Sequence, residues 1–278
     1  MSVFDFTQVD VFTDTPLQGN ALAVVHGADA LDEAQMQAFA RWTNLSETTF
    51  LLKPTEPTAD YRVRIFTPGG ELPFAGHPTL GSCHAWLQAG GRNRSSGWVM
   101  QQCGVGLVRI RIDADALAFA APPLVTRDAS ADELAPVLAA LGLNAGDVRG
   151  AQWLDNGPVW LALLLDGAAT VLRLEPDHGL LRLLPKVGVV GAHPAGADGQ
   201  FEVRAFAASI GINEDPVTGS LNASLAQWLM DSGLAPARYV ATQGARVGRT
   251  GRVTLTRDDQ ALWVGGHSVS CIRGQLTL

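Results

Sequence analysis

The sequence contains one short pattern twice. Residues 77–82 read His-Pro-Thr-Leu-Gly-Ser and residues 215–220 read Asp-Pro-Val-Thr-Gly-Ser, so Pro, Gly and Ser fall at the same offsets. Each copy leads into an apolar segment, and each follows a strand-like stretch in which Arg stands two residues before Phe (Arg64 and Arg204). Because these matches occur in the same order, the sequence predicts two related halves, each with a similar set of elements.

The segments around the two copies indicate the fold class. Alternating or β-branched runs predict strands over residues 4–12, 21–25, 47–52, 61–66 and 201–206. The segments after the two motifs are small or apolar on all sides, which predicts buried helices that end near Gln88 and Asp231. Many short strands around one long helix predict an α/β (α+β) fold, in which a curved, mainly antiparallel sheet wraps around a central helix in each half. Pro122-Pro123 is the expected boundary between the halves.

Composition excludes several classes of function. The chain has 278 residues and a net charge of −7, which disfavours a nucleic-acid-binding protein because such binding depends on clustered Lys and Arg. The sequence shows no signal-peptide pattern and no apolar run long enough to span a bilayer, so we expect a cytoplasmic protein with no membrane partner. Three isolated cysteines, without metal-ligand spacing, predict neither a disulfide framework nor a metal site.

The residue before each motif proline is a candidate functional group. If Pro is the first helical residue, the preceding residue is the N-cap, a role that suits Asp215 and does not suit His77. A helix start offers free N–H groups to an anion, and Gly219 and Ser220 add close access and a hydroxyl, so we expect a small carboxylate there. A histidine near the start of a helix favours the neutral form of its imidazole over the protonated form. A purely structural N-cap at Asp215 and an ordinary loop histidine at His77 remain alternatives.

Glu47 is a candidate acid/base. It stands at the start of a buried-looking strand, and burial raises the pKa of a carboxyl toward the range that is useful for proton transfer. From periodicity alone, an exposed acid at a strand start is the favoured interpretation. Asn20 follows Gly19 in a turn-rich segment, where a structural turn residue is the default interpretation.

Several strings together resemble a known family. Gly19-Asn20, Ser-Glu-Thr-Thr-Phe at 46–50, Pro-Phe-Ala-Gly-His-Pro at 73–78 and the second motif closely resemble the phenazine biosynthesis PhzF-like family, in the right order over essentially the whole chain. The resemblance implies the diaminopimelate epimerase-like fold, with two pseudo-symmetric halves and an active site in the cleft. It also implies that the last strand returns to the first half, giving residues 1–121 plus about 267–278 and residues 122–266 as the two halves.

The resemblance also implies roles for single residues. Glu47 would be the proton-shuttling acid/base, and His77 and Asp215 would line the site. The remaining residues are expected to bind substrate: Asn20, Gly76, Gly219 and Ser220. Diaminopimelate epimerases and proline racemases use two cysteines at the helix starts, whereas this sequence has His77 and Asp215 there, so thiol-based racemisation is not expected. The family further implies a homodimer.

These features predict an isomerase that works without a cofactor. It would bind a small carboxylate-bearing substrate between the halves and move a proton with Glu47. The alternative is a non-catalytic protein of the same fold that binds small carboxylates. The intact Asn-Leu-Ser-Glu and Gly-His-Pro strings favour the enzyme.

Overall fold

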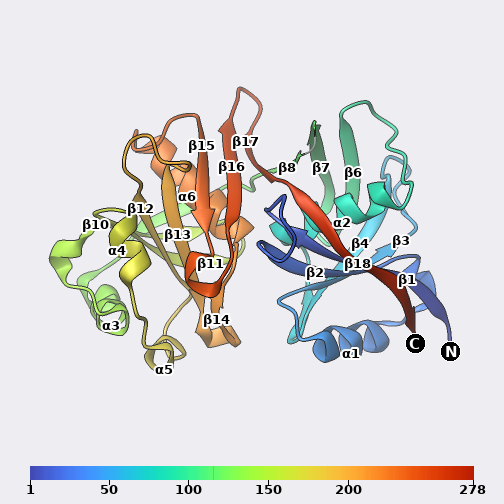
Figure 1. Cartoon of the computed structure of the whole chain (residues 1–278), viewed down its shortest axis with the longest axis horizontal. Helices are drawn as coiled ribbons and strands as arrows, with labels where there is room; N and C mark the ends of the chain where they lie inside the picture. Colours follow the sequence, from blue (N-terminus) through green and yellow to red (C-terminus); the bar gives the residue numbers. More distant parts are fainter. Residues whose placement is uncertain (115) are drawn as a thin grey trace. The chain divides into compact units, whose positions relative to one another are not determined.

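Each copy of the repeated motif leads into a buried helix. These helices are α2 (Gly76–Gln88) and α6 (Gly219–Asp231), and each has 13 residues, nine of which are buried. In the computed structural model, which describes residues 1–114 and 116–278, they belong to different compact units (Figure 1). Unit 1 comprises Met1–Ala120 and Gly265–Leu278, and unit 2 comprises Ala121–Val264.

Unit 1 has a mixed sheet around α2. Its strands are β1 (Val3–Val11), β2 (Asn20–Val25), β3 (Thr48–Leu52), β4 (Tyr61–Thr67), β5 (Gly70–Leu72), β6 (Trp98–Cys103), β7 (Gly106–Asp113), β8 (Ala116–Ala120) and β18 (Ser268–Thr277). The pairs β18–β1, β1–β2, β3–β4, β4–β5, β6–β7 and β7–β8 are antiparallel, and β2–β3 and β4–β6 are parallel. Helix α1 (Glu33–Thr43) packs its buried Met36 and Phe39 against Phe50 and Phe66 of this sheet.

Unit 2 repeats this arrangement. Its strands are β9 (Val125–Asp128), β10 (Val148–Asp155), β11 (Val159–Leu165), β12 (Val187–Ala192), β13 (Phe201–Ala207), β14 (Ile212–Asp215), β15 (Arg238–Gln243), β16 (Gly251–Arg257) and β17, which spans Leu262–Gly266 across the unit boundary. Its further helices are α3 (Ala131–Leu141), α4 (Ala168–Arg173) and α5 (His178–Leu181). The pairs β9–β10, β10–β11, β12–β13, β13–β14 and β15–β16 are antiparallel, and β11–β12 and β13–β15 are parallel.

The two units therefore share one order of pairings. In each unit, the second strand of the first hairpin pairs in parallel with the next strand in the sequence. A second parallel pairing joins the two strands that come before and after the strand leading to the central helix. The strand that pairs with the first hairpin comes from elsewhere in the chain: β18 in unit 1 and β9 in unit 2. The predicted fold class, a mainly antiparallel sheet around a central helix in each half, is confirmed.

An Arg–Glu pair also repeats. Arg64 of β4 pairs with Glu71 of β5, and Arg204 of β13 pairs with Glu214 of β14, each through two short N–H···O contacts of 2.9 Å or less. The guanidinium carbon of each arginine lies 5.0 Å from a phenylalanine ring two residues further along its own strand. The Arg–Phe spacing in the sequence thus marks the same structural feature in both units.

The helix starts differ from the prediction. Neither His77 nor Asp215 is an N-cap: α2 begins at Gly76 after Ala75, and α6 begins at Gly219 after Thr218. The physical reason in unit 2 is that β14 continues through Asp215, so the chain enters the helix three residues later. His77 and Ser220 are each the second residue of their helix. The repeated strings instead align His77 with Asp215, so they do not align the two helices.

Candidate active site

Glu47 lies in the link between α1 and β3. Asn44 ends α1 in the left-handed conformation (φ 53°), and β3 begins at the fully buried Thr48, one residue later than predicted. This path draws the Glu47 side chain inward, so that only 17% of it is exposed. Burial raises the pKa of Glu47 to about 7, and a hydrogen bond from the Ser46 side chain partly opposes the shift. Glu47 is therefore populated in both protonation states near neutral pH.

His77 faces this carboxyl. Its Nδ1 lies 3.4 Å from Oε2 of Glu47, and the residue is 5% exposed. Because His77 is in the first turn of α2, the Glu47 carboxylate lies near the positive end of a helix dipole. An imidazole and a carboxyl at this separation form a pair that can hold and exchange a proton.

Asn20 joins the same group through Ser46. The Ser46 hydroxyl lies 3.4 Å from Oδ1 of Asn20, which is the first residue of β2 and 3% exposed. The preceding Gly19 donates its N–H to the buried Asp10 carboxylate at 3.0 Å. A Cβ at Gly19 would lie 2.2 Å from the carbonyl oxygen of Val11, so glycine is required at this close approach.

Four predicted residues therefore belong to one part of unit 1. Glu47 and His77 are in contact, Gly76 is the buried residue next to His77, and Asn20 reaches the residue beside Glu47. The sequence could not settle the exposure of Glu47, because a buried and an exposed acid at a strand start give the same pattern.

Asp215, Gly219 and Ser220 lie at the start of α6 in unit 2. The Asp215 carboxylate accepts a 2.5 Å hydrogen bond from the Thr218 hydroxyl. Ser220, the second helical residue, is half-buried, and its Oγ accepts from Nε1 of Trp160 at 3.3 Å.

Gln243 of β15 holds this turn. Its amide makes four hydrogen bonds of 2.9 to 3.0 Å: it donates to the Asp215 carbonyl and the Thr218 hydroxyl, and it accepts from the Thr218 N–H and the Asn222 side chain. Gln243 is 1% exposed. No motif in the sequence marked Gln243 as part of this turn. Trp160 gave no signal at all, because a tryptophan in an apolar run is usual for a core strand.

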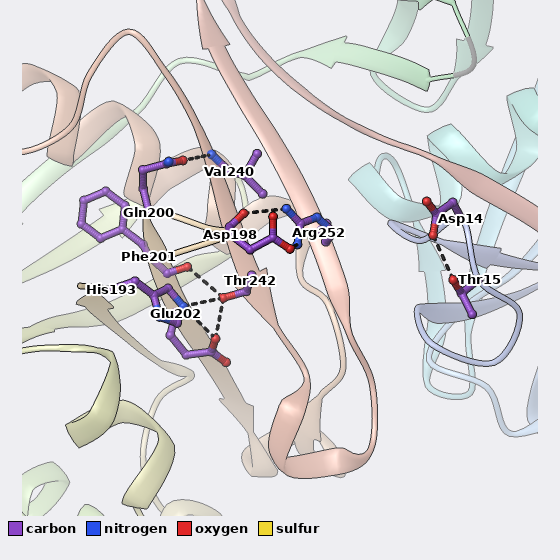
Figure 2. Close-up of polar contacts among 10 residues, drawn as sticks. All are labelled: Asp14, Thr15, His193, Asp198, Gln200, Phe201, Glu202, Val240, Thr242 and Arg252. Atoms are coloured by element: carbon purple, nitrogen blue, oxygen red, sulfur yellow. Dashed lines mark hydrogen bonds and ion pairs between the residues drawn. The ribbon is translucent and has the colours of Figure 1, made fainter. Parts of the chain in front are cut away.

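A further buried carboxyl lies outside the predicted residues. Glu202 of β13 accepts a 2.5 Å hydrogen bond from Thr242 of β15, and Nε2 of His193 lies 2.8 Å from that hydroxyl and 3.4 Å from Oε2 of Glu202 (Figure 2). Burial raises the pKa of Glu202. Since the three side chains contact one another, this cluster ties the β12–β13 loop to β13 and β15.

A hollow in unit 2 offers no unused charge to a ligand. It is lined by Arg204 and Glu214, which pair at 2.8 Å, and by Arg246 and Glu175, which also form an ion pair. None of the predicted site residues lines it.

Among residues 1–114 and 116–278, no group of three or more His, Cys, Asp or Glu side chains could hold a metal ion. Within the same described residues, no helix is both long and apolar enough to cross a bilayer.

The chain is similar to known proteins over nearly its whole length. Residues 9–274 match the model of a family described as phenazine biosynthesis-like protein. The chain is 36% identical over 294 residues to antisense-enhancing sequence 1 of Schizosaccharomyces pombe, covering 99% of both chains. It is 34% identical over 283 residues to the trans-2,3-dihydro-3-hydroxyanthranilate isomerase of Pseudomonas aeruginosa, covering 98% of this chain and 99% of the other.

The fold is likewise that of a solved structure. A phenazine biosynthesis protein of the PhzF family from Bacillus anthracis superimposes with a TM-score of 0.86 at 22% identity, with full coverage of both chains. At this identity the likeness concerns the fold, and it confirms the diaminopimelate epimerase-like fold that the sequence strings imply.

Proposed function

Because the chain belongs to the phenazine biosynthesis-like protein family and is an isomerase, we propose that it moves a proton on a small carboxylate-bearing substrate by general acid/base catalysis. We further propose that Glu47 carries the proton and that the reaction needs no cofactor.

The environment of Glu47 carries this proposal. A general acid/base works best when its pKa is near the operating pH, and burial brings the pKa of Glu47 to about 7. An ordinary glutamate, with a pKa near 4.3, would be almost fully ionised at neutral pH and a poor proton donor. His77, with Nδ1 3.4 Å from Oε2, orients the carboxyl in both of its states.

The proposed step conserves all atoms and electrons. The Glu47 carboxylate removes a proton from a substrate carbon, and the electron pair of that C–H bond enters an adjacent π system of the substrate. The resulting carboxyl then returns a proton to a different carbon, which shifts the double bond. No oxidant or reductant is consumed, so the chemistry requires only a base that becomes an acid.

The start of α6 is the proposed place for the substrate carboxylate. The N–H groups of a first helical turn and the Ser220 hydroxyl are suitable donors, and Gly219 adds no side chain that would block them. We assign to Asp215 a positioning or proton-relay role, supported by the short hydrogen bond from Thr218 that fixes its carboxylate. Asn20 and Gly76 complete the proposed set of substrate-binding residues.

The proposal is tested by isomerisation in D2O. The first substrate is trans-2,3-dihydro-3-hydroxyanthranilate, after the named activity of the Pseudomonas aeruginosa relative, and a panel of small unsaturated carboxylates is assayed beside it. We expect the product to contain deuterium at the carbon that receives the proton. We expect Glu47→Gln to lower kcat by at least about 100-fold, the usual contribution of a general acid/base.

The matched control is Glu56→Gln, the same chemical change at an exposed loop position. This variant should retain the activity of the unaltered protein. Full isomerisation by Glu47→Gln would remove Glu47 from the mechanism. Tight binding of carboxylates with neither isomerised product nor deuterium incorporation would contradict the proposed proton transfer.

A further inference from the structure

We propose that Trp160 is a positioning residue that makes the Ser220 hydroxyl a hydrogen-bond donor toward an acceptor oxygen of the ligand. This inference rests on the proposed function, since it takes the start of α6 as the place where the substrate carboxylate binds.

The indole of Trp160 determines the polarity of Ser220. An indole N–H can only donate, so at 3.3 Å the Ser220 Oγ must act as acceptor. The hydroxyl hydrogen of Ser220 therefore points away from Trp160. Within the part of the chain that the structure describes, this hydroxyl donates to no acceptor. Ser220 is half-buried rather than buried, so part of the residue is accessible to a ligand.

The β10–β11 hairpin holds Ser220 at two points. Trp160 of β11 contacts its hydroxyl, and Asn156 in the hairpin turn donates to its carbonyl oxygen at 3.0 Å. The turn is closed by a 2.9 Å hydrogen bond from the Gly157 N–H to Oδ1 of Asp155, and Gly157 has the positive φ (112°) that favours glycine. The second residue of α6 is thus fixed by a hairpin more than 50 residues earlier in the chain.

Trp160 is itself held rigidly. It is 3% exposed, and Nζ of Lys186 lies 5.0 Å from the centre of its ring. A cation at this distance is attracted to the face of the indole. Since the ring has little freedom, the direction of its N–H, and therefore the orientation of the Ser220 hydroxyl, is set before a ligand arrives.

This arrangement defines the chemical class of the ligand atom that contacts Ser220. A hydroxyl oriented as a donor donates to a carboxylate oxygen and is a poorer partner for an ammonium or amide N–H at the same place. The hairpin would thus select the acid group of a substrate without taking part in the proton transfer at Glu47.

The test uses the Trp160 indole as a reporter. In ¹H–¹⁵N spectra the side chains of the seven tryptophans give separate indole signals, and the signal that Trp160→Phe removes belongs to Trp160. The probe is 3-hydroxyanthranilate, with 2-aminophenol as the same ring without a carboxylate. We expect 3-hydroxyanthranilate to shift the Trp160 signal and 2-aminophenol to leave it unchanged. In Ser220→Ala the probe should no longer shift it.

Affinity provides the second measurement. Trp160→Phe keeps an aromatic ring at this position but removes the N–H, and we expect it to weaken binding of 3-hydroxyanthranilate about 2- to 10-fold, the value of one hydrogen bond. Trp153→Phe on the neighbouring strand β10 is the matched control and should bind like the unaltered protein. With an active substrate, Trp160→Phe should raise KM and leave kcat unchanged.

Three results would overturn the inference. They are a Trp160 signal that 3-hydroxyanthranilate does not shift at any attainable concentration, equal affinity in Trp160→Phe and the unaltered protein, and equal affinity in Ser220→Ala. Because binding and the indole signal require no turnover, these results are independent of the Glu47 test. A protein that binds as expected but does not isomerise would contradict only the proposed proton transfer.

Discussion

Glu47 is a residue whose burial affects stability as well as chemistry. In an unfolded chain its pKa is that of an ordinary glutamate, whereas in the folded protein it is about 7. A raised carboxyl pKa means that the folded state holds its proton more tightly. The associated stability is therefore fully present below the unfolded pKa and is lost as pH rises through about 7. Burial of Glu47 thus lowers the stability of the folded state near neutral pH.

The variant Glu47→Gln keeps the shape of the side chain and removes its charge. Relative to this variant, the unaltered protein should lose stability between pH 5 and pH 8, by at most about 3 kcal/mol. Urea unfolding of both proteins at several pH values measures the difference. Glu56→Gln, at an exposed position, should give no comparable pH-dependent difference. A constant difference between Glu47→Gln and the unaltered protein over this pH range would show that Glu47 is not significantly desolvated.

Residue roles were predictable to different degrees. Glu47, His77 and Asp215 were predicted as candidates because carboxyl and imidazole groups near element starts are chemically conspicuous, and the family resemblance implies roles for them. Trp160 was not found, because its relation to Ser220 depends on a contact over 60 positions in the sequence, which no local pattern reports.

At the scale of elements, the start of α6 is stabilised from outside the helix. In many helices the residue at the N-cap supplies the oxygen that accepts the first free N–H groups. Here Thr218 is the N-cap and makes no such side-chain contact with the helix, whereas Gln243 of β15 accepts from the Thr218 N–H. The entry to the helix therefore depends on a strand that follows it in the sequence.

We expect Gln243→Ala to lower the free energy of unfolding by about 2 to 4 kcal/mol, because buried partners lose four hydrogen bonds. It should also weaken carboxylate binding at the start of α6. Gln227→Ala is the matched control, since Gln227 lies on α6 itself but makes one side-chain hydrogen bond, to the Pro122 carbonyl. Chemical denaturation of both variants gives the comparison. Equal losses would show that Gln243 has no special role in holding the turn.

Helix positions were less predictable than helix existence. The apolar character of both motif helices was sufficient to predict them, and they are buried as expected. The first residues of these helices were not predicted. At α6, the local preference for Asp at an N-cap and Pro at the next position was overridden by the pairing of Asp215 with Ala205 of β13. Tertiary strand pairing extends β14 and delays the helix.

At the scale of the whole molecule, unit 1 is completed by a strand from outside its main run of residues, whereas the corresponding strand of unit 2 lies within that unit's own run. Strand β18 comes from the end of the chain and pairs with β1 over nine residue pairs, whereas β9 precedes the first hairpin of unit 2 and pairs with β10. Hydrophobic patterning predicts strands but cannot say which strands pair over more than 250 residues. That the last strand returns to the first half was available only from the family resemblance.

The pairing of β18 with β1 should protect unit 1 against hydrogen exchange. Removal of residues 268–278 would leave β1 as an edge strand with unpaired backbone groups, so unit 1 should lose much of its protection against hydrogen exchange. Peptides from β1 and β2 should exchange faster, while peptides from β10 to β13, whose pairing partners all lie in unit 2, should be unchanged. Removal of residues 277 and 278 alone, the control, deletes one of the nine pairs and should affect only the first residues of β1. If the long truncation accelerated hydrogen exchange equally in both units, the two units would unfold as one cooperative body. The pairing of β18 with β1 would then stabilise the whole chain rather than unit 1.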